Sequence, residues 1–392
     1  MKKDSNTASK TILLSAGGTG GHLFPAQALA TELLQDGHDV IFATDERGMV
    51  FYEKSTWPQK DQVSLNPLQS ATWRPGVFGK ISALFTMGLG VLQALKLIKT
   101  KKPDCIVGFG GYPSFPAMFA GQLLGIPTIL HEQNAVVGKA NAKLAQKAEH
   151  IALSLPGTKG IDSIREKTSV TGNPVRAEIL SKQNTALPPF DENSTLNIFV
   201  MGGSQGARIF GEVIPKAIKK LPEHLQKRIS IQQQCRPEEI NDVTGRFSVL
   251  ETTSNIQTFF TDVETQLSNC HVFIGRSGAS TVAEVAVVGR PAIFVPMQHA
   301  DQQQKHNANV IADTGGGWVM TEDGFTDEAL ATRLESFFNL PDILTKAAVS
   351  ASGCGRPYAT RDLAAVIYKT IGLETEHSQN TKTEKEKKDI AA

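Results

Sequence analysis

Five consecutive small residues, 277–281 (SGAST), follow a short apolar strand predicted at 271–275 and open a predicted helix. The first backbone N–H groups of a helix have no partner within it, and the helix dipole is positive at this end. Small side chains leave these N–H groups uncovered, so the segment could bind a phosphate group. The alternative is an ordinary strand–helix–strand unit whose helix happens to begin with small residues.

One carboxylate lies early in the same predicted helix. Glu284 comes three residues after Thr281, and its oxygens could accept hydrogen bonds from a vicinal diol such as that of a ribose. Gly289 and Pro291 end the helix, and residues 292–295 are predicted to return as a buried strand. A diphosphate site one helical turn from a diol acceptor is typical of nucleotide binding.

A glycine-rich loop, 17–22 (GGTGGH), follows a predicted strand at 11–16 and precedes a predicted helix and a second strand at 39–44. Such a loop lets a ligand approach the backbone closely but does not identify it. The GxGxxG pattern of nicotinamide-binding folds would need a glycine at Leu23. Asp45, after the second strand, is the one feature that favours such a cofactor.

A histidine lies at the mouth of this loop. His22 begins the helix, and an imidazole with an ordinary pKa of about 6.5 suits a general base at neutral pH. The alternative is a histidine that only caps or packs against the loop.

A second glycine-rich loop, 202–208 (GGSQGAR), follows a predicted strand at 197–201. Two strand–glycine-loop–helix starts predict an α/β protein with two Rossmann-like, doubly wound parallel-sheet domains that face each other across a ligand cleft. The predicted boundaries are an N-terminal domain at 1–180, a linker at 181–195, a C-terminal domain at 196–355, a helix at 356–374 that packs back on the N-terminal domain, and a disordered charged tail at 375–392.

Other polar residues are candidates for ligand contacts. Arg176 ends the turn GNPVR and is either a phosphate or sugar contact or a surface arginine. Ser204 is either a phosphate-binding hydroxyl or a small residue that fits a tight turn. The polar run 131–134 (HEQN) ends a predicted strand, where α/β sheets bind ligands. The carboxamides at 302–304 are suited to sugar hydroxyls.

Composition excludes several classes of protein. A net charge of +1 over 392 residues gives no basic field of the kind that binds nucleic acid. The 4 cysteines show no metal-binding spacing, so we expect reduced thiols in a cytosolic protein. The sequence contains no DxD motif, so a metal ion that bridges the diphosphate is not indicated. We expect no signal peptide, because no apolar region follows the two N-terminal lysines. We expect no transmembrane helix, because no uninterrupted apolar run reaches about 18 residues.

The segment 77–102 is apolar nearly all round and ends in lysines, among them Lys96, Lys99 and Lys101. One interpretation is an interfacial segment that dips into lipid headgroups while the lysines meet anionic lipid. The other is a buried domain helix with a solvated basic end.

Seven motifs occur in order from about residue 12 to the last predicted helix, and together they resemble the MurG family of GlcNAc transferases. They are GGTGGHLFP (17–25), GGYPS (110–114), HEQN (131–134), GNPVR (172–176), GGSQGAR (202–208), RSGASTVAE (276–284) and FVPMQHADQQQ (294–304).

The resemblance implies a GT-B fold and an inverting transfer of GlcNAc from UDP-GlcNAc to the 4-hydroxyl of undecaprenyl-pyrophosphoryl-MurNAc-pentapeptide, in peptidoglycan synthesis. The N-terminal half would bind this lipid-linked acceptor and the C-terminal half would bind UDP-GlcNAc, with no tightly bound cofactor and no nucleic acid. The enzyme would lie peripherally on the cytoplasmic face of the bacterial inner membrane, against its anionic surface, with segment 77–102 as the membrane-facing patch.

Carried over to this sequence, the resemblance makes His22 the general base. It also assigns UDP-GlcNAc contacts to Thr19, Gly20, Gly21, Asn134, Arg176, Ser204, Phe260, Ala279, Ser280, Thr281, Glu284, Gln303 and Gln304. Two positions depart from the family pattern. Phe260 stands where an isoleucine often lies beside the uracil, so stacking there should differ, and Ser280 replaces a common leucine at a backbone contact.

Three other functions are alternatives. A UDP-GlcNAc 2-epimerase has the same architecture but would turn over UDP-GlcNAc without an acceptor. A nicotinamide dehydrogenase is disfavoured by Leu23. A membrane-associated nucleotide sensor would bind the donor without releasing UDP in the presence of acceptor.

Overall fold

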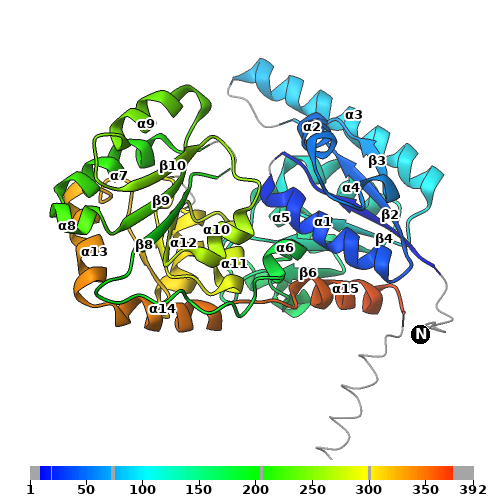
Figure 1. Ribbon diagram of the computed structural model, residues 1–392. Helices are drawn as coiled ribbons and strands as arrows, with labels where there is room; N and C mark the ends of the chain where they lie inside the picture. Colours follow the sequence, from blue (N-terminus) through cyan, green and yellow to red (C-terminus); the bar gives the residue numbers. More distant parts are fainter. Residues whose placement is uncertain (1–8, 19, 72–75, 204–205, 299–301, 374–392) are drawn as a thin grey trace, which may run out of the picture. The chain divides into compact units, whose positions relative to one another are not determined.

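The computed structural model describes residues 9–18, 20–71, 76–203, 206–298 and 302–373. The chain divides into two compact units, each of which is a parallel sheet between helices (Figure 1). The first unit comprises 1–133, 137–174 and 358–392, and the second unit comprises 134–136 and 175–357.

The sheet of the first unit has the strand order β3-β2-β1-β4-β5-β6-β7, with parallel neighbours throughout. Its strands are β1 (Thr11–Ser15), β2 (Asp39–Thr44), β3 (Ser64–Pro67), β4 (Cys105–Gly108), β5 (Thr128–Glu132), β6 (His150–Leu153) and β7 (Thr168–Val170). Its helices are α1 (Gly20–Gln35), α2 (Glu46–Lys54), α3 (Val77–Lys101), α4 (Gly111–Leu123), α5 (Lys139–Leu144) and α15 (Ala359–Thr370), with 3-10 turns at Lys60–Gln62, Ala145–Lys147 and Asp162–Lys167.

The sheet of the second unit repeats this order as β10-β9-β8-β11-β12-β13 and is also parallel. Its strands are β8 (Leu196–Met201), β9 (Ile229–Gln234), β10 (Thr253–Gln257), β11 (Val272–Gly275), β12 (Ala292–Phe294) and β13 (Gly317–Val319). Its helices are α6 (Ala177–Leu180), α7 (Arg208–Lys220), α8 (Glu223–Gln226), α9 (Ile240–Phe247), α10 (Val263–Asn269), α11 (Ala279–Val288), α12 (Gln303–Ala312), α13 (Asp327–Asn339) and α14 (Asp342–Gly353), with a 3-10 turn at Pro237–Glu239.

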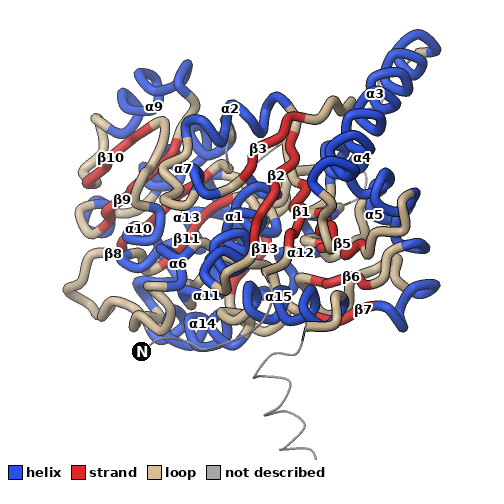
Figure 2. The backbone as a smooth tube through the Cα atoms, turned by 90° about the vertical axis from the view of Figure 1, so that its right-hand side faces the viewer, coloured by secondary structure: helices blue, strands red, loops and turns tan. Residues whose placement is uncertain are grey.

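Alternate side chains of each strand enter different cores, one on each face of the sheet. Ile12 and Leu14 of β1 pack in a cluster with residues of α1 and α15, whereas Leu13 packs with residues of α3 and α4. The last helix, α15, therefore lies in the core of the first unit, where the Tyr368 hydroxyl also donates to Asp36 Oδ2 at 2.7 Å. In Figure 2 the strands of each sheet lie among helices, and one end of α3 extends beyond its neighbours.

The boundary between the units lies between Pro174 and Val175, earlier than the linker predicted at 181–195. That polar segment is anchored in the second unit instead. The buried guanidinium of Arg290 donates to the backbone carbonyls of Thr185 and Ala186 at 3.0 and 3.2 Å. Composition alone suggested a linker because it does not reveal such a distant hydrogen-bond donor.

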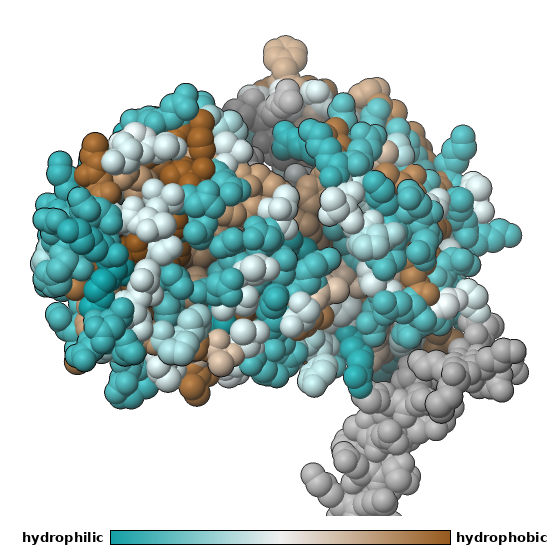
Figure 3. All heavy atoms as spheres, viewed as in Figure 1, coloured by the Kyte–Doolittle hydropathy of each residue, from teal (hydrophilic) through white to brown (hydrophobic). Residues whose placement is uncertain are grey.

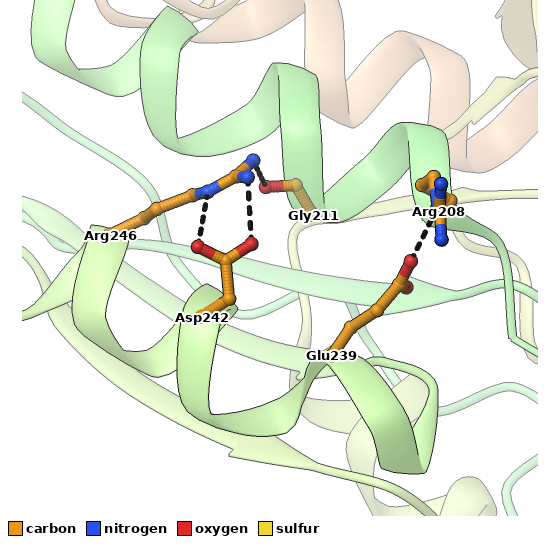
Figure 4. Close-up of polar contacts among 5 residues, drawn as sticks. All are labelled: Arg208, Gly211, Glu239, Asp242 and Arg246. Atoms are coloured by element: carbon orange, nitrogen blue, oxygen red, sulfur yellow. Dashed lines mark hydrogen bonds and ion pairs between the residues drawn. The ribbon is translucent and has the colours of Figure 1, made fainter.

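Helix α7, which follows the second glycine loop, is joined to α9 by a hydrogen bond to a backbone carbonyl that has no partner within α7. Pro215 has no N–H, so the Gly211 carbonyl four residues earlier cannot receive its helical hydrogen bond. Arg246 Nη1 donates to that carbonyl at 3.0 Å, and Asp242 holds the same guanidinium (Figure 4). A side chain at position 211 would clash, because its Cβ would lie 2.6 Å from a methyl group of Val243. The packing thus fixes α7 against α9.

Candidate active site

In both sheets the strand order reverses beside the first strand, between β1 and β4 and between β8 and β11. Open parallel sheets bind ligands in the crevice outside the carboxyl ends of the strands at this reversal. The two glycine loops follow β1 and β8, and the segment with SGAST follows β11. The fold therefore places every glycine-rich motif singled out in the sequence at a ligand-binding edge.

The first glycine loop is braced by Asp45. This carboxylate caps α2 by accepting from Gly48 N at 3.0 Å, and the same oxygen accepts from Gly18 N at 3.1 Å. Gly18 has φ +82, and a Cβ on Gly17 would lie 2.6 Å from that of Pro113. Asp45, the one feature that favoured a nicotinamide cofactor, thus has a structural role in holding the glycine loop.

His22 lies in the first turn of α1 against the glycine turn after β4. A Cβ built on Gly111 would lie 3.5 Å from His22 Nε2, which is ordinary van der Waals contact, and the φ of +73 at this position favours glycine. Burial lowers the pKa of His22, while the charge of Glu132 and hydrogen bonds with Phe109 and Gln133 offset part of this effect. The imidazole is therefore neutral at pH 7, as a general base must be.

Glu132 is the last residue of β5, and its buried carboxylate lies close enough to His22 to affect the pKa of the imidazole. Its Oε2 accepts from Gly138 N and from Asn141 Nδ2, both at 2.8 Å, and these donors open α5. The neighbouring His131 is fully buried, and its Nε2 donates to the Gly172 carbonyl at 3.1 Å. Burial lowers the pKa of His131 to about 4, so this ring is also neutral at pH 7.

In the second unit, α11 begins with the predicted phosphate-binding residues Ala279, Ser280 and Thr281. Its N-cap is Gly278, which has no side chain to accept hydrogen bonds from the first N–H groups. The helix therefore begins within the run of small residues, as the sequence predicted, and its N-cap directly follows the buried Ser277. Anion binding at this start remains a prediction.

The predicted ribose acceptor and the predicted phosphate contact form an ion pair. Arg176 Nη2 and Nε both donate to Glu284 Oε1, at 3.0 and 3.2 Å. The side chains are 25% and 12% exposed, so the pair lies at the surface edge of α11. Neither the surface-arginine interpretation of Arg176 nor a free carboxylate at Glu284 describes this structure.

Asn307 holds Asn134, one of the predicted UDP-GlcNAc contacts, and the segment that opens α11. The sequence alone did not identify this residue. Its side chain is fully buried, accepts from Ala135 N at 2.8 Å and donates to Asn134 Oδ1 and the Ser277 carbonyl. Ser277 Oγ also donates to the Gln304 carbonyl at 2.8 Å. The available signal was spacing, because Asn307 lies one turn after Gln304 on the same helix face.

Phe260 does not lie where a ring could stack on a base. It is 3% exposed and packs edge-to-face on Phe199 at a centroid distance of 5.4 Å. Any contact with a base there must come from backbone atoms, because the core occupies the ring. The adjacent Phe259 is the exposed aromatic residue of this segment.

The other predicted contacts are placed as follows. Gly20 and Gly21 open α1, and Gln303 opens α12. Gln304 Oε1 accepts from Met297 N at 3.0 Å. Thr19 and Ser204 lie outside the described residues. Among the residues that the structure describes, no group of three or more His, Cys, Asp or Glu side chains could hold a metal ion.

The two parallel sheets have the GT-B fold, and comparison with known proteins makes the chain a glycosyltransferase. The family model for the N-terminal domain of glycosyltransferase family 28 matches residues 12–153, and the model for its C-terminal domain matches 197–352. The Acinetobacter baumannii MurG crystal structure matches with a TM-score of 0.74 and 31% identity, covering 92% of this chain and 99% of that one.

Curated relatives narrow the assignment. The UDP-N-acetylglucosamine–N-acetylmuramyl-(pentapeptide) pyrophosphoryl-undecaprenol N-acetylglucosamine transferase of Rhodospirillum centenum is 44% identical, covering 92% of this chain and 95% of the relative. The protein of that name from Paramagnetospirillum magneticum is 41% identical over 94% and 99%. The chain belongs to this family, the MurG family of N-acetylglucosamine transferases.

A UDP-GlcNAc 2-epimerase from Neisseria meningitidis shares the fold, with a TM-score of 0.64 at 14% identity. This likeness concerns architecture alone.

Proposed function

We propose that this protein transfers GlcNAc from UDP-GlcNAc to the 4-hydroxyl of undecaprenyl-pyrophosphoryl-MurNAc-pentapeptide, with inversion at the anomeric carbon. The observation that carries this proposal is the 44% identity over 92% of the chain to a transferase named for these substrates. The product would supply peptidoglycan synthesis, and through it cell shape and division.

The second unit supplies the donor site in this proposal. The start of α11 receives the diphosphate, and Glu284 receives the ribose hydroxyls after Arg176 turns from the carboxylate toward a phosphate. Gln303 and Gln304 contact the GlcNAc from the start of α12. The shared anchor Ser277 supports this arrangement, since it joins the starts of α11 and α12 through its hydrogen bonds to Gln304 and Asn307.

His22 acts as the general base. Its lowered pKa keeps the imidazole neutral, so it can take the proton of the acceptor hydroxyl as that oxygen attacks the anomeric carbon. The bond from that carbon to the diphosphate breaks, and UDP leaves with the electron pair. The first N–H groups of α11 stabilise the charge that develops on UDP, as preorganised donors do elsewhere.

The membrane-facing surface is formed by α3. Among the residues that the structure describes, α3 is the one helix that is long and apolar enough to cross a membrane. The sequence alone predicts no transmembrane helix. The buried residues of α3 lie on one face only, so the interpretation as a buried domain helix is wrong. The other face exposes Val77, Phe78, Ile81, Leu84, Phe85 and Leu92. Hydrophobic side chains gather at this rim of the first unit (Figure 3).

We infer that α3 lies in the headgroup region of an anionic membrane rather than across it. Lys80 and Lys96 interrupt the apolar surface, and Lys99 and Lys101 occupy the last turn, where they can meet lipid phosphates. The protein would then be a peripheral enzyme on the cytoplasmic face of the inner membrane, where its lipid-linked acceptor is embedded.

Release of UDP tests the proposed function. Purified protein should release UDP from UDP-GlcNAc only when a prenyl-linked MurNAc-peptide acceptor is present. Turnover of UDP-GlcNAc without acceptor would indicate a 2-epimerase, and donor binding without UDP release would indicate a sensor. Thermal stabilisation by NAD but not by UDP-GlcNAc would support the disfavoured dehydrogenase.

A further inference from the structure

Two arginines flank strand β9 of the second unit, and their surroundings differ. Arg228 precedes the strand and is satisfied by the protein. Its Nε donates to the Ser194 carbonyl at 3.1 Å, its Nη2 donates to the Asp191 carbonyl at 2.8 Å, and its guanidinium lies 4.9 Å from the Phe338 ring centroid. This arginine therefore has a structural role at the amino end of β9.

Arg236 follows β9 and lies against the second glycine loop. A Cβ built on Gly206 would lie 3.1 Å from Arg236 Cγ and 3.3 Å from its backbone N, so the arginine stem covers this glycine. Gly206 has φ +69, a backbone conformation that favours glycine. Gly206 and the arginine stem are thus in direct contact.

The guanidinium of Arg236 lacks a partner within the described part of the chain. Its Nε is shielded from solvent and has no hydrogen-bond acceptor, and no carboxylate there forms an ion pair with it. Arg208, two residues after Gly206, instead pairs with Glu239 at 2.7 Å (Figure 4). A shielded N–H without an acceptor is costly, and an anionic ligand would remove this cost.

The position of Arg236 is that of a ligand-binding residue. β9 runs parallel to β8, so both strands end at the same edge of the sheet. Gln234, the last residue of β9, accepts from Gly202 N at 3.2 Å and donates to the Thr258 carbonyl at 3.4 Å. It thereby joins the ends of β8, β9 and β10, and Arg236 extends from this joined edge onto the glycine loop.

We propose that Arg236 binds the diphosphate of the nucleotide donor beside the second glycine loop. This rests on the proposed function and adds a donor-binding residue that none of the seven motifs contains. The dipole at a helix start supplies only about half an elementary charge, whereas a diphosphate carries more than one negative charge. A planar guanidinium can donate two parallel hydrogen bonds to phosphate oxygens and supplies a full charge.

The test compares ligands that differ only in phosphate. Affinities of UDP, UMP and uridine are measured by calorimetry for the wild type, Arg236→Ala, Arg236→Lys and the control Arg228→Ala, which removes the same charge at the opposite end of β9. We expect Arg236→Ala to weaken UDP binding roughly ten- to one-hundredfold and leave uridine binding unchanged. Arg236→Lys should recover part of the loss, and Arg228→Ala should bind UDP like the wild type once thermal melting shows that it is folded.

Different results separate this proposal from the one it rests on. Wild-type protein that binds no UDP contradicts the proposed function, and the role of Arg236 with it. Wild-type protein that binds UDP, with Arg236→Ala binding UDP equally well, overturns the role of Arg236 alone. An equal loss of uridine and UDP affinity also overturns it, because it would indicate that Arg236 only shapes the loop.

Discussion

Arg176 directs two of its N–H groups at a single oxygen of Glu284, leaving the other carboxylate oxygen outside this ion pair. One half of the carboxylate is therefore oriented by the protein. Because Glu284 lies on α11 close to its start, the pair links the predicted ribose contact to the predicted phosphate site. Binding of the donor should therefore exchange this pair for contacts of Glu284 with the ribose and of Arg176 with a phosphate.

Glu284→Ala tests the ribose assignment. The wild type should prefer UDP to 2′-deoxy-UDP by roughly tenfold, because the deoxy ligand cannot donate the 2′-hydroxyl hydrogen bond. Glu284→Ala should bind both ligands weakly and equally. Calorimetry with the two ligands measures the preference directly, and a variant that keeps the wild-type preference would remove Glu284 from the ribose site.

His22→Ala should lower kcat by roughly 10²–10⁴ and leave UDP affinity near that of the wild type. Burial lowers the pKa of His22, so the acid limb of the wild-type rate profile should lie below the ordinary histidine value of about 6.5. The rate should fall as the pH drops through that limb, since protonated His22 cannot act as a base. Near-normal turnover by His22→Ala would move the role of base to Glu132.

The buried His131 should make the protein less stable in acid. Its pKa is lowered to about 4 in the folded state, so between pH 6.5 and 4 the unfolded chain binds a proton that the folded chain does not. Its stabilising contribution is thus complete above about pH 6.5 and is lost as the pH falls toward 4. Urea unfolding at pH 7.5 and pH 5 should show a smaller decrease for His131→Asn than for the wild type. Equal decreases would mean that His131 does not contribute.

The contact of Arg246 with the Gly211 carbonyl should matter only because of Pro215. Arg246→Ala should destabilise the wild type by about 1 kcal/mol, since it leaves that carbonyl unpaired. In a Pro215→Ala background the restored N–H can bond the carbonyl, so the same substitution should cost less. Denaturant unfolding of the four proteins gives this difference. Arg208→Ala is the control and should cost the same in both backgrounds, and additive effects of Arg246→Ala and Pro215→Ala would exclude the coupling.

The exposed face of α3 should bind vesicles that contain anionic lipid. Phe85→Ser removes a large apolar side chain that is 69% exposed and should weaken binding roughly tenfold. Val349→Ser, at an equally exposed position on α14 in the second unit, is the matched control and should have no effect. Co-sedimentation with vesicles measures both. Equal binding by Phe85→Ser and the wild type would argue against the interfacial role.

Much of the fold follows from the sequence because apolar runs, glycines and prolines mark the elements. The helix at 77–101 and the strand Asp39–Thr44 lie where the pattern predicts them. β5 ends in the polar run as predicted, but His131 and Glu132 are fully within the strand and buried, which their polar character did not indicate. Tertiary hydrogen bonds hold His131 Nε2 and Glu132 Oε2 in the core, and a local pattern does not contain such partners.

The candidate site shows the same limit. Glycine loops and small residues indicate where a ligand could approach, so the start of α11 was predictable. The role of Asn307 depends on Ala135 and Ser277, which are far from it in sequence. The burial of Phe260 depends on Phe199 in another strand. Such long-range contacts are fixed only when the sheet assembles.

The central claim is that the start of α11 holds the diphosphate of the departing UDP. A crystal structure of the protein with UDP-GlcNAc tests it most directly. We expect phosphate oxygens within hydrogen-bond distance of the backbone N–H groups of residues 279–281, with the ribose at Glu284. Phosphates bound away from α11, with those N–H groups facing water or protein, would contradict the account.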